Sequence, residues 1–308
     1  MKVLVTGVAG QLGHDVMNEL SRRGIEGVGS DIHETYSGIM DNSPVCTMDY
    51  VQLDITDKDK VLKVITEDIK PDAIVHCAAW TAVDAAEDDE NFKKVFAVNV
   101  TGTGNIAFAA AAIDAKVLYL STDYVFDGQG EEPWEEDCKK YSPLNFYGNT
   151  KLMGELMVSS MLSKFFVVRI AWVFGLNGNN FVKTMLKVGK THDEVRVVND
   201  QVGTPTYTFD LARLIVDMIN TDKYGFFHAT NEGGYISWYD FTCEIYKQAG
   251  YSTKVTPVTT EEYGLSKAKR PNNSRLSKEK LKANSFTPLP TWQDALSRYL
   301  GEIDVENL

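Results

Sequence analysis

The sequence has few cysteines, and they lack the spacings that bind metals or form redox pairs. The four cysteines lie far apart, with no CxxC pair and no histidines at metal-ligand spacing: Cys46, Cys77, Cys138 and Cys243. This pattern favours a reducing compartment, so we expect a cytoplasmic protein. We also expect no metal site.

Long apolar runs and an excess of basic charge are missing as well. The apolar run before Gly7 is too short for a signal peptide, and residues 106–113 fall well short of the roughly 20 residues that span a bilayer. With 43 acidic against 31 basic residues the formal net charge is −12, and a field of this sign repels nucleic acids and anionic membranes. We therefore expect neither of these as a partner.

The composition is that of a folded, enzyme-sized protein. The 308 residues are 44% hydrophobic and 24% charged, and this length suggests about two domains. In the first half, short β-rich runs alternate with amphipathic stretches, which predicts βαβ units and a Rossmann-type doubly wound parallel sheet of the α/β class. We expect a dinucleotide-binding domain over 1–172, joined by about 195–219, and mainly a smaller C-terminal substrate-binding lobe over 173–308.

Apolar periodicity also predicts the individual elements of the first half. The expected strands are residues 3–6, 25–30, 51–54, 73–77, 117–121 and 165–170. The expected helices are residues 11–23, 58–69, 90–113 and 144–161. Ser142 followed by Pro143 is typical of an N-cap and a first helical position, so the last of these helices is expected to begin there.

A glycine-rich turn follows the first expected strand directly. In the string GVAGQLG, Gly7 permits a tight turn, Gly10 lets the backbone approach a pyrophosphate, and Gly13 allows a helix to pack closely on the strand. Gln11 and Leu12 lie in the first turn of the helix that follows. These five residues are predicted to bind the diphosphate of a dinucleotide, although a tight βα turn without a ligand has the same pattern.

An acidic residue closes the second expected strand. Asp31 lies at the distance from the glycines where a carboxylate accepts hydrogen bonds from the adenosine ribose, and it disfavours a 2′-phosphate. His33, two residues on, tolerates either form of the cofactor. We therefore expect NADH or NADPH, with a mild preference for NADH. Further cofactor contacts are expected after the third and fourth strands, from Asp54, Ile55, Ala78 and Ala79.

Three residues are candidates for acid–base chemistry. Tyr147 and Lys151 are four residues apart and share a helix face, and an ammonium nearby favours the phenolate form of a tyrosine. Thr122 ends the strand before this helix, at the edge where doubly wound sheets bind ligands. A hydroxyl there can bind a carbonyl or alkoxide oxygen, so the three residues predict a Thr–Tyr–Lys catalytic group.

The glycine motif, Thr122 and the pair Tyr147 and Lys151 together resemble the extended branch of the short-chain dehydrogenase/reductase superfamily. Within it, longer strings resemble the dTDP-4-dehydrorhamnose reductases over nearly the whole chain. These strings are AAWTAVD (78–84), STDYVFDG (121–128), SPLNFYG (142–148), RIAWVFG (169–175), GNNF (178–181), DQVGTPT (200–206) and RPxxS (270–274).

The resemblance implies reduction of the 4-keto group of dTDP-4-dehydro-L-rhamnose to give dTDP-L-rhamnose for cell-surface polysaccharide, by a monomer or homodimer. Hydride would come from NAD(P)H, Tyr147 would protonate the sugar O4, Lys151 would hold the nicotinamide ribose and Thr122 would bind the oxyanion. Asn99 would support the cofactor site. Contacts to the dTDP-sugar are implied for Val83, Thr122, Asp123, Tyr124, Trp172, Asn180, Gln201, Arg270 and Arg275.

Two other functions stay open at this point. The long segment between Asp31 and Asp54 is typical of nucleotide-sugar epimerases of the same superfamily, which retain tightly bound NAD. The regulatory subunit of methionine adenosyltransferase also resembles these reductases, so a non-catalytic dinucleotide-binding role is the second alternative. A dehydratase is disfavoured because Tyr124 follows Asp123, where dehydratases place a glutamate.

Overall fold

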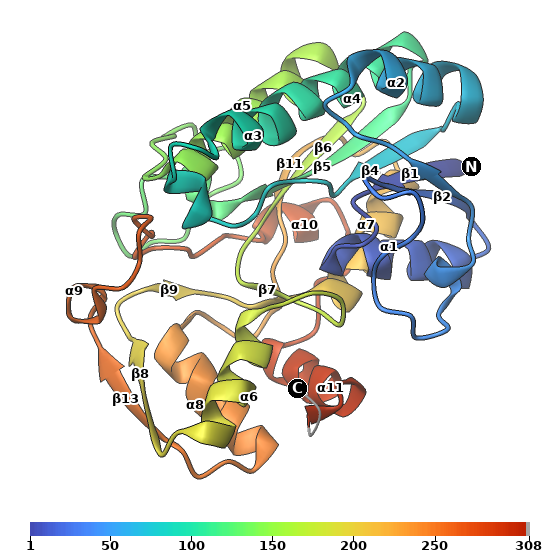
Figure 1. Cartoon of the computed structure of the whole chain (residues 1–308). Coiled ribbons are helices and arrows are strands. Elements are labelled where there is room, and N and C mark those ends of the chain that lie inside the picture. The colour runs from blue at the N-terminus through green and yellow to red at the C-terminus, as the bar shows by residue number, and fades with distance from the viewer. Residues whose placement is uncertain (306–308) are drawn as a thin grey trace.

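The computed structural model describes residues 1–305, which form a larger upper part and a smaller lower lobe in the view of Figure 1. The upper part is built on seven strands: β1 (Lys2–Thr6), β2 (Glu26–Asp31), β3 (Tyr50–Gln52), β4 (Ala73–His76), β5 (Lys116–Thr122), β6 (Phe165–Ile170) and β11 (Gly225–His228). Their order is β11-β6-β5-β4-β1-β2-β3, and all neighbouring pairs are parallel. The doubly wound α/β fold predicted from the sequence is therefore confirmed.

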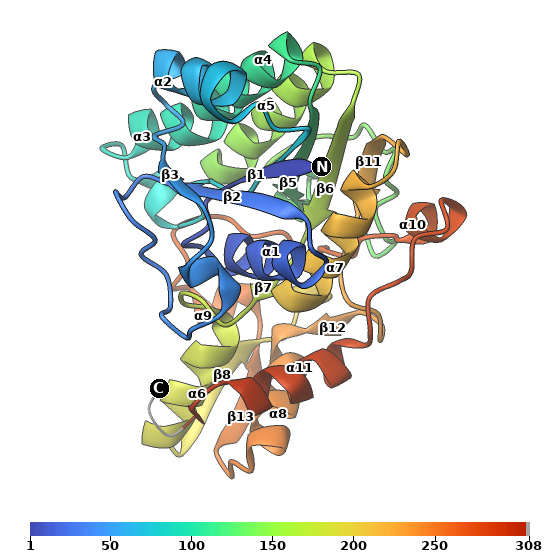
Figure 2. The same cartoon turned by 90° about the vertical axis from the view of Figure 1, so that its right-hand side faces the viewer.

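Helices cover both faces of this sheet (Figures 1 and 2). One face packs against α1 (Gln11–Arg22) and α7 (Thr208–Ile219). The other carries α2 (Lys58–Lys63), η2 (Val64–Ile69), α3 (Phe92–Phe96), η4 (Ala97–Gly102), α4 (Thr103–Ala112) and α5 (Phe146–Met161). Because strand side chains alternate between faces, Val3 and Val5 are buried with α1 and α7, whereas Leu4 is buried with α2 and α4.

The structure corrects two boundaries of the first half. The third expected strand, 51–54, is shifted to β3, and α5 begins at Phe146 rather than at Ser142. Asn145 caps α5, because its backbone is extended and its side-chain oxygen accepts a hydrogen bond from the Gly148 amide at 2.8 Å. Asparagine is as good an N-cap as serine. The helix start predicted from Ser142 and Pro143 was therefore wrong.

The second half of the chain contributes to both parts of the molecule. β11, which the sequence did not predict, adds the seventh strand beside β6. Within the segment 195–219, α7 packs against α1, but β8 (Glu194–Val198) pairs in parallel with β13 (Lys254–Val258) in the lower lobe. The segment is thus divided between the parts rather than returning to the sheet as a whole.

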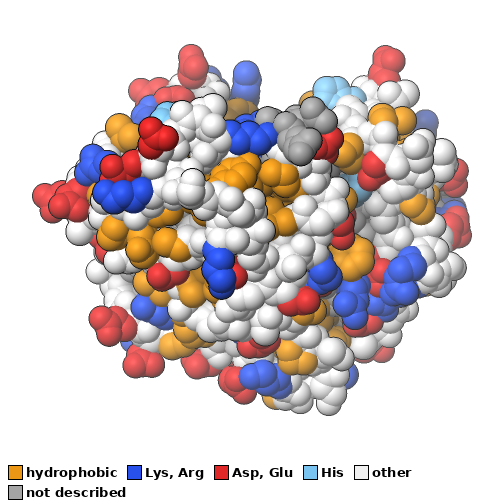
Figure 3. All heavy atoms as spheres, turned by 90° about the horizontal axis from the view of Figure 1, so that it is seen from below, with side chains coloured by type: hydrophobic (Ala, Val, Ile, Leu, Met, Phe, Trp, Pro, Cys, Tyr) orange, Lys and Arg blue, Asp and Glu red, His pale blue; other side chains and the backbone are white. Residues whose placement is uncertain are grey.

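The lower lobe has its own aromatic core, in which Phe174, Tyr207, Phe241 and Tyr299 are buried together. Its helices are α6 (Phe181–Thr191), α8 (Trp238–Ala249), α9 (Thr260–Tyr263) and α11 (Trp292–Glu302). The short helix α10 (Glu279–Ala283) instead contacts β11 in the upper part, where its Leu281 is buried in the core of the sheet. Its short strand pairs are β7 (Val173–Phe174) with β10 (Thr206–Tyr207) and β9 (Val202–Gly203) with β12 (Ile236–Ser237). From below, acidic, basic and apolar side chains lie interspersed on this lobe (Figure 3).

One helical stretch is long and apolar enough to cross a membrane by length and composition alone. It runs over Phe92–Ala112, with a mean hydropathy of 1.4 over its most apolar window. In the structure its alanine-rich end, α4, packs between α2 and α5, and Ile106 and Ala110 are buried in the core on that face of the sheet. A core helix accounts for this apolar stretch.

Candidate active site

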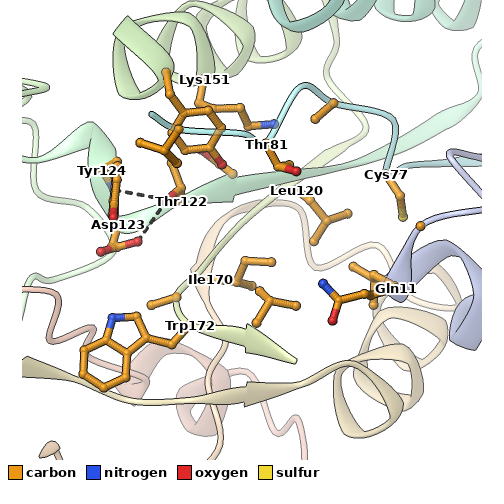
Figure 4. Close-up of a pocket in the computed structure, with 18 of the residues that line it drawn as sticks. Gln11, Cys77, Thr81, Leu120, Thr122, Asp123, Tyr124, Lys151, Ile170 and Trp172 are labelled. Carbon is orange, nitrogen blue, oxygen red and sulfur yellow. Dashed lines mark hydrogen bonds between the residues drawn. The ribbon is translucent and has the colours of Figure 1, made fainter. Parts of the chain in front are cut away.

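A cleft of about 440 Å³ opens where the carboxyl ends of the sheet strands face the lower lobe, the place where doubly wound sheets bind ligands. Figure 4 shows Lys151 and Thr122 above it, with Trp172 and Gln11 on the lower side. The structure brings together here many of the residues predicted from the sequence: Gly7, Gly10, Gln11, Leu12, Gly13, Ala79, Val83, Thr122, Asp123, Tyr124, Tyr147, Lys151 and Trp172.

The glycine loop forms a cradle with no room for side chains. Gly7 has a φ of +72°, and a Cβ on it would lie 2.7 Å from the Ala78 nitrogen. A Cβ on Gly13 would lie 2.3 Å from the carbonyl oxygen of Gly7. Gly10 is the N-cap of α1 and offers no side-chain cap, so the first amides of this helix are open to an anion. These residues therefore fit a dinucleotide diphosphate.

A second cavity, of about 270 Å³, continues the cradle toward β2 and β3. Its lining includes the expected adenosine contacts Asp31, Asp54, Ile55, Ala78 and Ala79. The Asp31 carboxylate accepts hydrogen bonds from the amides of Ala9 at 3.0 Å and Ile32 at 2.8 Å, which ties it to the glycine loop. His33 does not line this cavity; it is exposed, and its carbonyl accepts a hydrogen bond from Tyr50.

Lys151 is buried beside the cleft, with its ammonium 4.2 Å from the centre of the Tyr119 ring. Burial lowers the pKa of Lys151 to about 7, opposed by the charges of Glu155 and Cys77. The lysine therefore titrates near neutrality, which is the range where a change of charge affects a reaction at physiological pH.

Tyr147 and Thr122 both line the cleft, and their side chains lie within hydrogen-bonding reach of each other. Burial raises the pKa of the Tyr147 phenol and Asp123 raises it further, while a hydrogen bond with Thr122 lowers it. The net shift is upward, so the expectation that the lysine pair favours the phenolate is wrong for this cleft. The phenol is accordingly protonated at neutral pH.

Asp123 determines the direction of the Thr122 hydroxyl. Thr122 donates to one carboxylate oxygen of Asp123 at 2.9 Å and accepts a hydrogen bond from the Tyr124 amide at 3.2 Å; both contacts are drawn in Figure 4. The other Asp123 oxygen, Oδ2, is buried without a hydrogen-bond partner among residues 1–305. Burial raises the pKa of Asp123 to about 6.

A third cavity, of about 360 Å³, lies beyond Trp238 in the lower lobe. Two predicted substrate residues, Gln201 and Arg270, line it. The Arg270 guanidinium binds both oxygens of Asp84, at 2.9 and 2.7 Å. This fork geometry is the one that arginine uses for carboxylate and phosphate alike, so the cavity presents an anion-binding group at its wall.

Besides His33, three predicted residues lie outside these cavities. Asn99 is buried and exchanges hydrogen bonds with the backbone of Trp80 at 2.8 and 3.2 Å, so it holds the loop after β4. Asn180 caps α6 and donates to the side chain of Gln11 at 3.1 Å. Arg275 donates to Asn273 at 3.0 Å. None of the three lines a cavity described above, so their contacts to cofactor or substrate stay predictions.

Sequence reasoning missed several residues of the cleft and of the third cavity. Trp238 lines both, and Asn179, next to the predicted Asn180, lines the cleft. Further lining residues are Cys77, Thr81, Leu120, Ser121, Ile170, Ala171 and Val173 in the cleft, and Phe181, Met185, Arg196, Val197, Val198, Tyr263, Leu265 and Ser266 in the third cavity. Position at a strand end would have pointed to Cys77 and Ser121. Within residues 1–305, no group of three or more histidine, cysteine or acidic side chains is arranged to hold a metal ion.

A half-buried tyrosine and a buried lysine beside a dinucleotide cradle are arranged for hydride and proton transfer. On a doubly wound parallel sheet, they define an oxidoreductase of the short-chain dehydrogenase/reductase superfamily. The chain belongs to a narrower family within it, because the family model of the RmlD substrate binding domain matches residues 1–305.

Individual relatives agree with this assignment along the whole chain. The dTDP-4-dehydrorhamnose reductase of Escherichia coli (strain K12) is 35% identical over 315 residues, covering 98% of each chain. A solved dTDP-4-dehydrorhamnose reductase from Clostridium acetobutylicum is 41% identical, with a TM-score of 0.87 over 98% of this chain and 99% of that one. The one from Bacillus anthracis, solved in complex with NADP, is 37% identical with the same TM-score and coverage.

Proposed function

We propose that this protein reduces the 4-keto group of dTDP-4-dehydro-L-rhamnose to give dTDP-L-rhamnose, an activated sugar for cell-surface polysaccharide. One observation carries the proposal. The cleft that holds Tyr147, Thr122 and Lys151 lies between a dinucleotide cradle and the cavity walled by Arg270. A sugar whose diphosphate binds at that arginine would extend its hexose toward the tyrosine.

The chain's own residues supply binding and proton transfer. Bound NADH or NADPH would supply the hydride to C4. Tyr147, protonated at neutral pH because burial raises its pKa, donates its proton to the sugar O4. Lys151 binds the nicotinamide ribose, and Thr122 contacts the reacting oxygen. Asp123, which lines the cleft, accepts a hydrogen bond from a sugar hydroxyl and orients the ring.

The cavity beyond Trp238 suits the nucleotide portion of the substrate. Arg270 binds the Asp84 carboxylate there through two N–H groups. A guanidinium binds phosphate oxygens in the same two-pronged way, so the diphosphate would take the place of Asp84 at Arg270. The reaction is placed in the cytoplasm, consistent with four cysteines that are all free thiols.

The test is the loss of NADH absorbance, and separately of NADPH absorbance, with dTDP-4-dehydro-L-rhamnose. Tyr147→Phe should lower the rate by about 10²–10⁴-fold with little change in dinucleotide affinity. Tyr224→Phe is a matched control, because its hydroxyl donates to the exposed Asp222. Full turnover in Tyr147→Phe would remove the proton-donor role. Dinucleotide binding without any turnover by the wild type would favour the non-catalytic alternative.

A further inference from the structure

Two tryptophans form a wall between the cleft and the cavity beyond it. The rings of Trp172 and Trp238 are stacked, with centroids 3.7 Å apart and an interplanar angle of 16°. Trp172 lines only the cleft, whereas Trp238 lines both spaces. In Figure 4 the Trp172 ring lies below Asp123, on the side of the cleft opposite Lys151. The stacked pair therefore stands where a hexose would join its nucleoside diphosphate.

Trp172 is held in an uncommon backbone conformation. Its φ is +51°, in the left-handed region that non-glycine residues seldom adopt. Its carbonyl accepts a hydrogen bond from the Thr206 amide at 3.1 Å. Such a conformation persists only where surrounding contacts fix it, and functional sites are where such residues cluster.

The contacts that fix the Trp172 ring come from two adjacent short strands. A Cβ on Gly203 of β9 would lie 3.0 Å from Cε2 of this ring, so the ring packs directly on the Gly203 backbone. Gly203 pairs with Ile236 of β12, two residues before Trp238. Trp238 is itself backed by Phe181 at 4.4 Å between ring centroids. Ser237 and Asp240 form a capping box that fixes the start of α8.

We propose that Trp238 is a positioning and specificity residue, which holds the Trp172 ring in place and thereby sets the spacing between the hexose and the nucleoside diphosphate. The inference rests on the proposed function and extends it. Trp238 acts through Trp172 and through the wall that the two rings form. Its loss should therefore weaken the binding of a substrate that occupies both the cleft and the third cavity more than the binding of a ligand that occupies one of them.

The first readout is spectroscopic and needs no turnover. Two indoles at this distance and orientation should give an excitonic couplet in far-ultraviolet circular dichroism. We expect Trp172→Phe and Trp238→Phe each to abolish the couplet and Trp134→Phe to keep it, since Trp134 stacks on Phe126 instead of on an indole. A couplet unchanged in Trp238→Phe would overturn the proposed pair.

The second readout separates positioning from simple stability. Trp238→Leu should weaken binding of the whole dTDP-sugar up to about tenfold, while binding of dTDP alone and of NADH changes less than about twofold. Trp238→Phe should recover part of the loss, because a phenyl ring still packs on Trp172. Gly203→Ala, which pushes on the Trp172 ring, should reproduce the effect of Trp238→Leu. Equal losses for dTDP and the dTDP-sugar would indicate a merely structural role and contradict the inference.

These outcomes are distinct from those that test the reductase activity. If the circular dichroism couplet changes when the dTDP-sugar binds but the protein shows no turnover, the proposed tryptophan wall is supported and the proposed reductase activity is refuted. Tyrosine-dependent turnover with an unchanged affinity for the dTDP-sugar in Trp238→Leu would keep the reductase and refute the positioning role.

Discussion

The two halves of the active site are built in different ways. On the dinucleotide side, the ligand would contact the backbone of Gly7, Gly10 and Gly13. At Gly7 and Gly13 the neighbouring main chain leaves no room for a Cβ. On the sugar-nucleotide side, the ligand would meet side chains, such as Arg270 and Trp238, from segments far apart in the chain. A substitution in the backbone cradle should therefore disrupt the fold and dinucleotide binding together. A substitution in the side-chain pocket should remove one contact and lower the affinity for the substrate by a limited amount.

This contrast is tested most strongly at Gly13. Gly13→Ala places a Cβ 2.3 Å from the Gly7 carbonyl oxygen and 2.8 Å from the Val8 Cα, and backbone cannot move aside as a flexible side chain would. We expect a loss of unfolding free energy of about 3 kcal/mol and a loss of dinucleotide affinity of over 100-fold, on the order of that same energy. Thermal unfolding and fluorescence titration with NADH measure the two effects.

The matched control is Gly301→Ala in α11, where a Cβ would meet nothing within 4 Å. Alanine in an exposed helix should raise stability by about 0.5–1 kcal/mol and leave NADH binding unchanged. Comparable dinucleotide affinity in Gly13→Ala and the wild type would show that the loop is not the tight cradle described above.

On the sugar-nucleotide side, the largest effect is expected at Arg270. In the free protein the Arg270 guanidinium binds the Asp84 carboxylate, and in the proposed complex it binds the diphosphate. Arg270→Met removes this guanidinium, and hydrogen bonds to charged groups are worth about 1.5–3 kcal/mol. The KM for the dTDP-sugar should rise roughly 10–100-fold, with NADH affinity unchanged. Arg213→Met, at an exposed position on α7, removes the same charge and should change neither constant. A fall in kcat without a change in KM would place Arg270 elsewhere in the reaction.

The same contrast explains how far the sequence was informative. Gly7, Gly10 and Gly13 form a local motif, and Tyr147 and Lys151 are one helical turn apart, so short-range spacing is enough to predict them. The stack of Trp172 on Trp238 depends on the pairing of β9 with β12, and no local spacing encodes such a contact.

Some of the predicted site residues make other contacts in the structure, for physical reasons of the same kind. Asn99 and Asn180 are polar residues near the cleft, but their amides satisfy buried backbone and helix-end groups instead. Whether an asparagine serves the fold or a ligand depends on neighbours that only the folded chain supplies. His33 lies two residues after Asp31, yet the chain turns away from the adenosine cavity after β2.

A smaller effect is expected from the charge of Lys151. Burial lowers its pKa to about 7, so the ammonium is present below that pH and is lost above it. If the ammonium holds the nicotinamide ribose, kcat/KM for NADH should fall as pH rises through about 7, approaching tenfold per unit above it. Lys151→Met should give a low, flat profile. Lys183→Met should keep the wild-type profile, since Lys183 donates to backbone carbonyls outside the cleft, including that of Gly178 at 2.9 Å. A wild-type profile flat across neutrality would contradict this role.

The smallest effect concerns the choice between NADH and NADPH. Asp31 lines the adenosine cavity and is tied to the amides of Ala9 and Ile32, so its carboxylate would repel a 2′-phosphate. Asp31→Asn keeps one acceptor and removes the charge. The ratio of kcat/KM for NADPH to that for NADH should therefore rise about fivefold, the equivalent of about 1 kcal/mol. His33→Ala should leave the ratio within about twofold, because His33 does not line the cavity. A larger shift from His33→Ala than from Asp31→Asn would mean that the segment after β2 closes over the ribose when the dinucleotide binds.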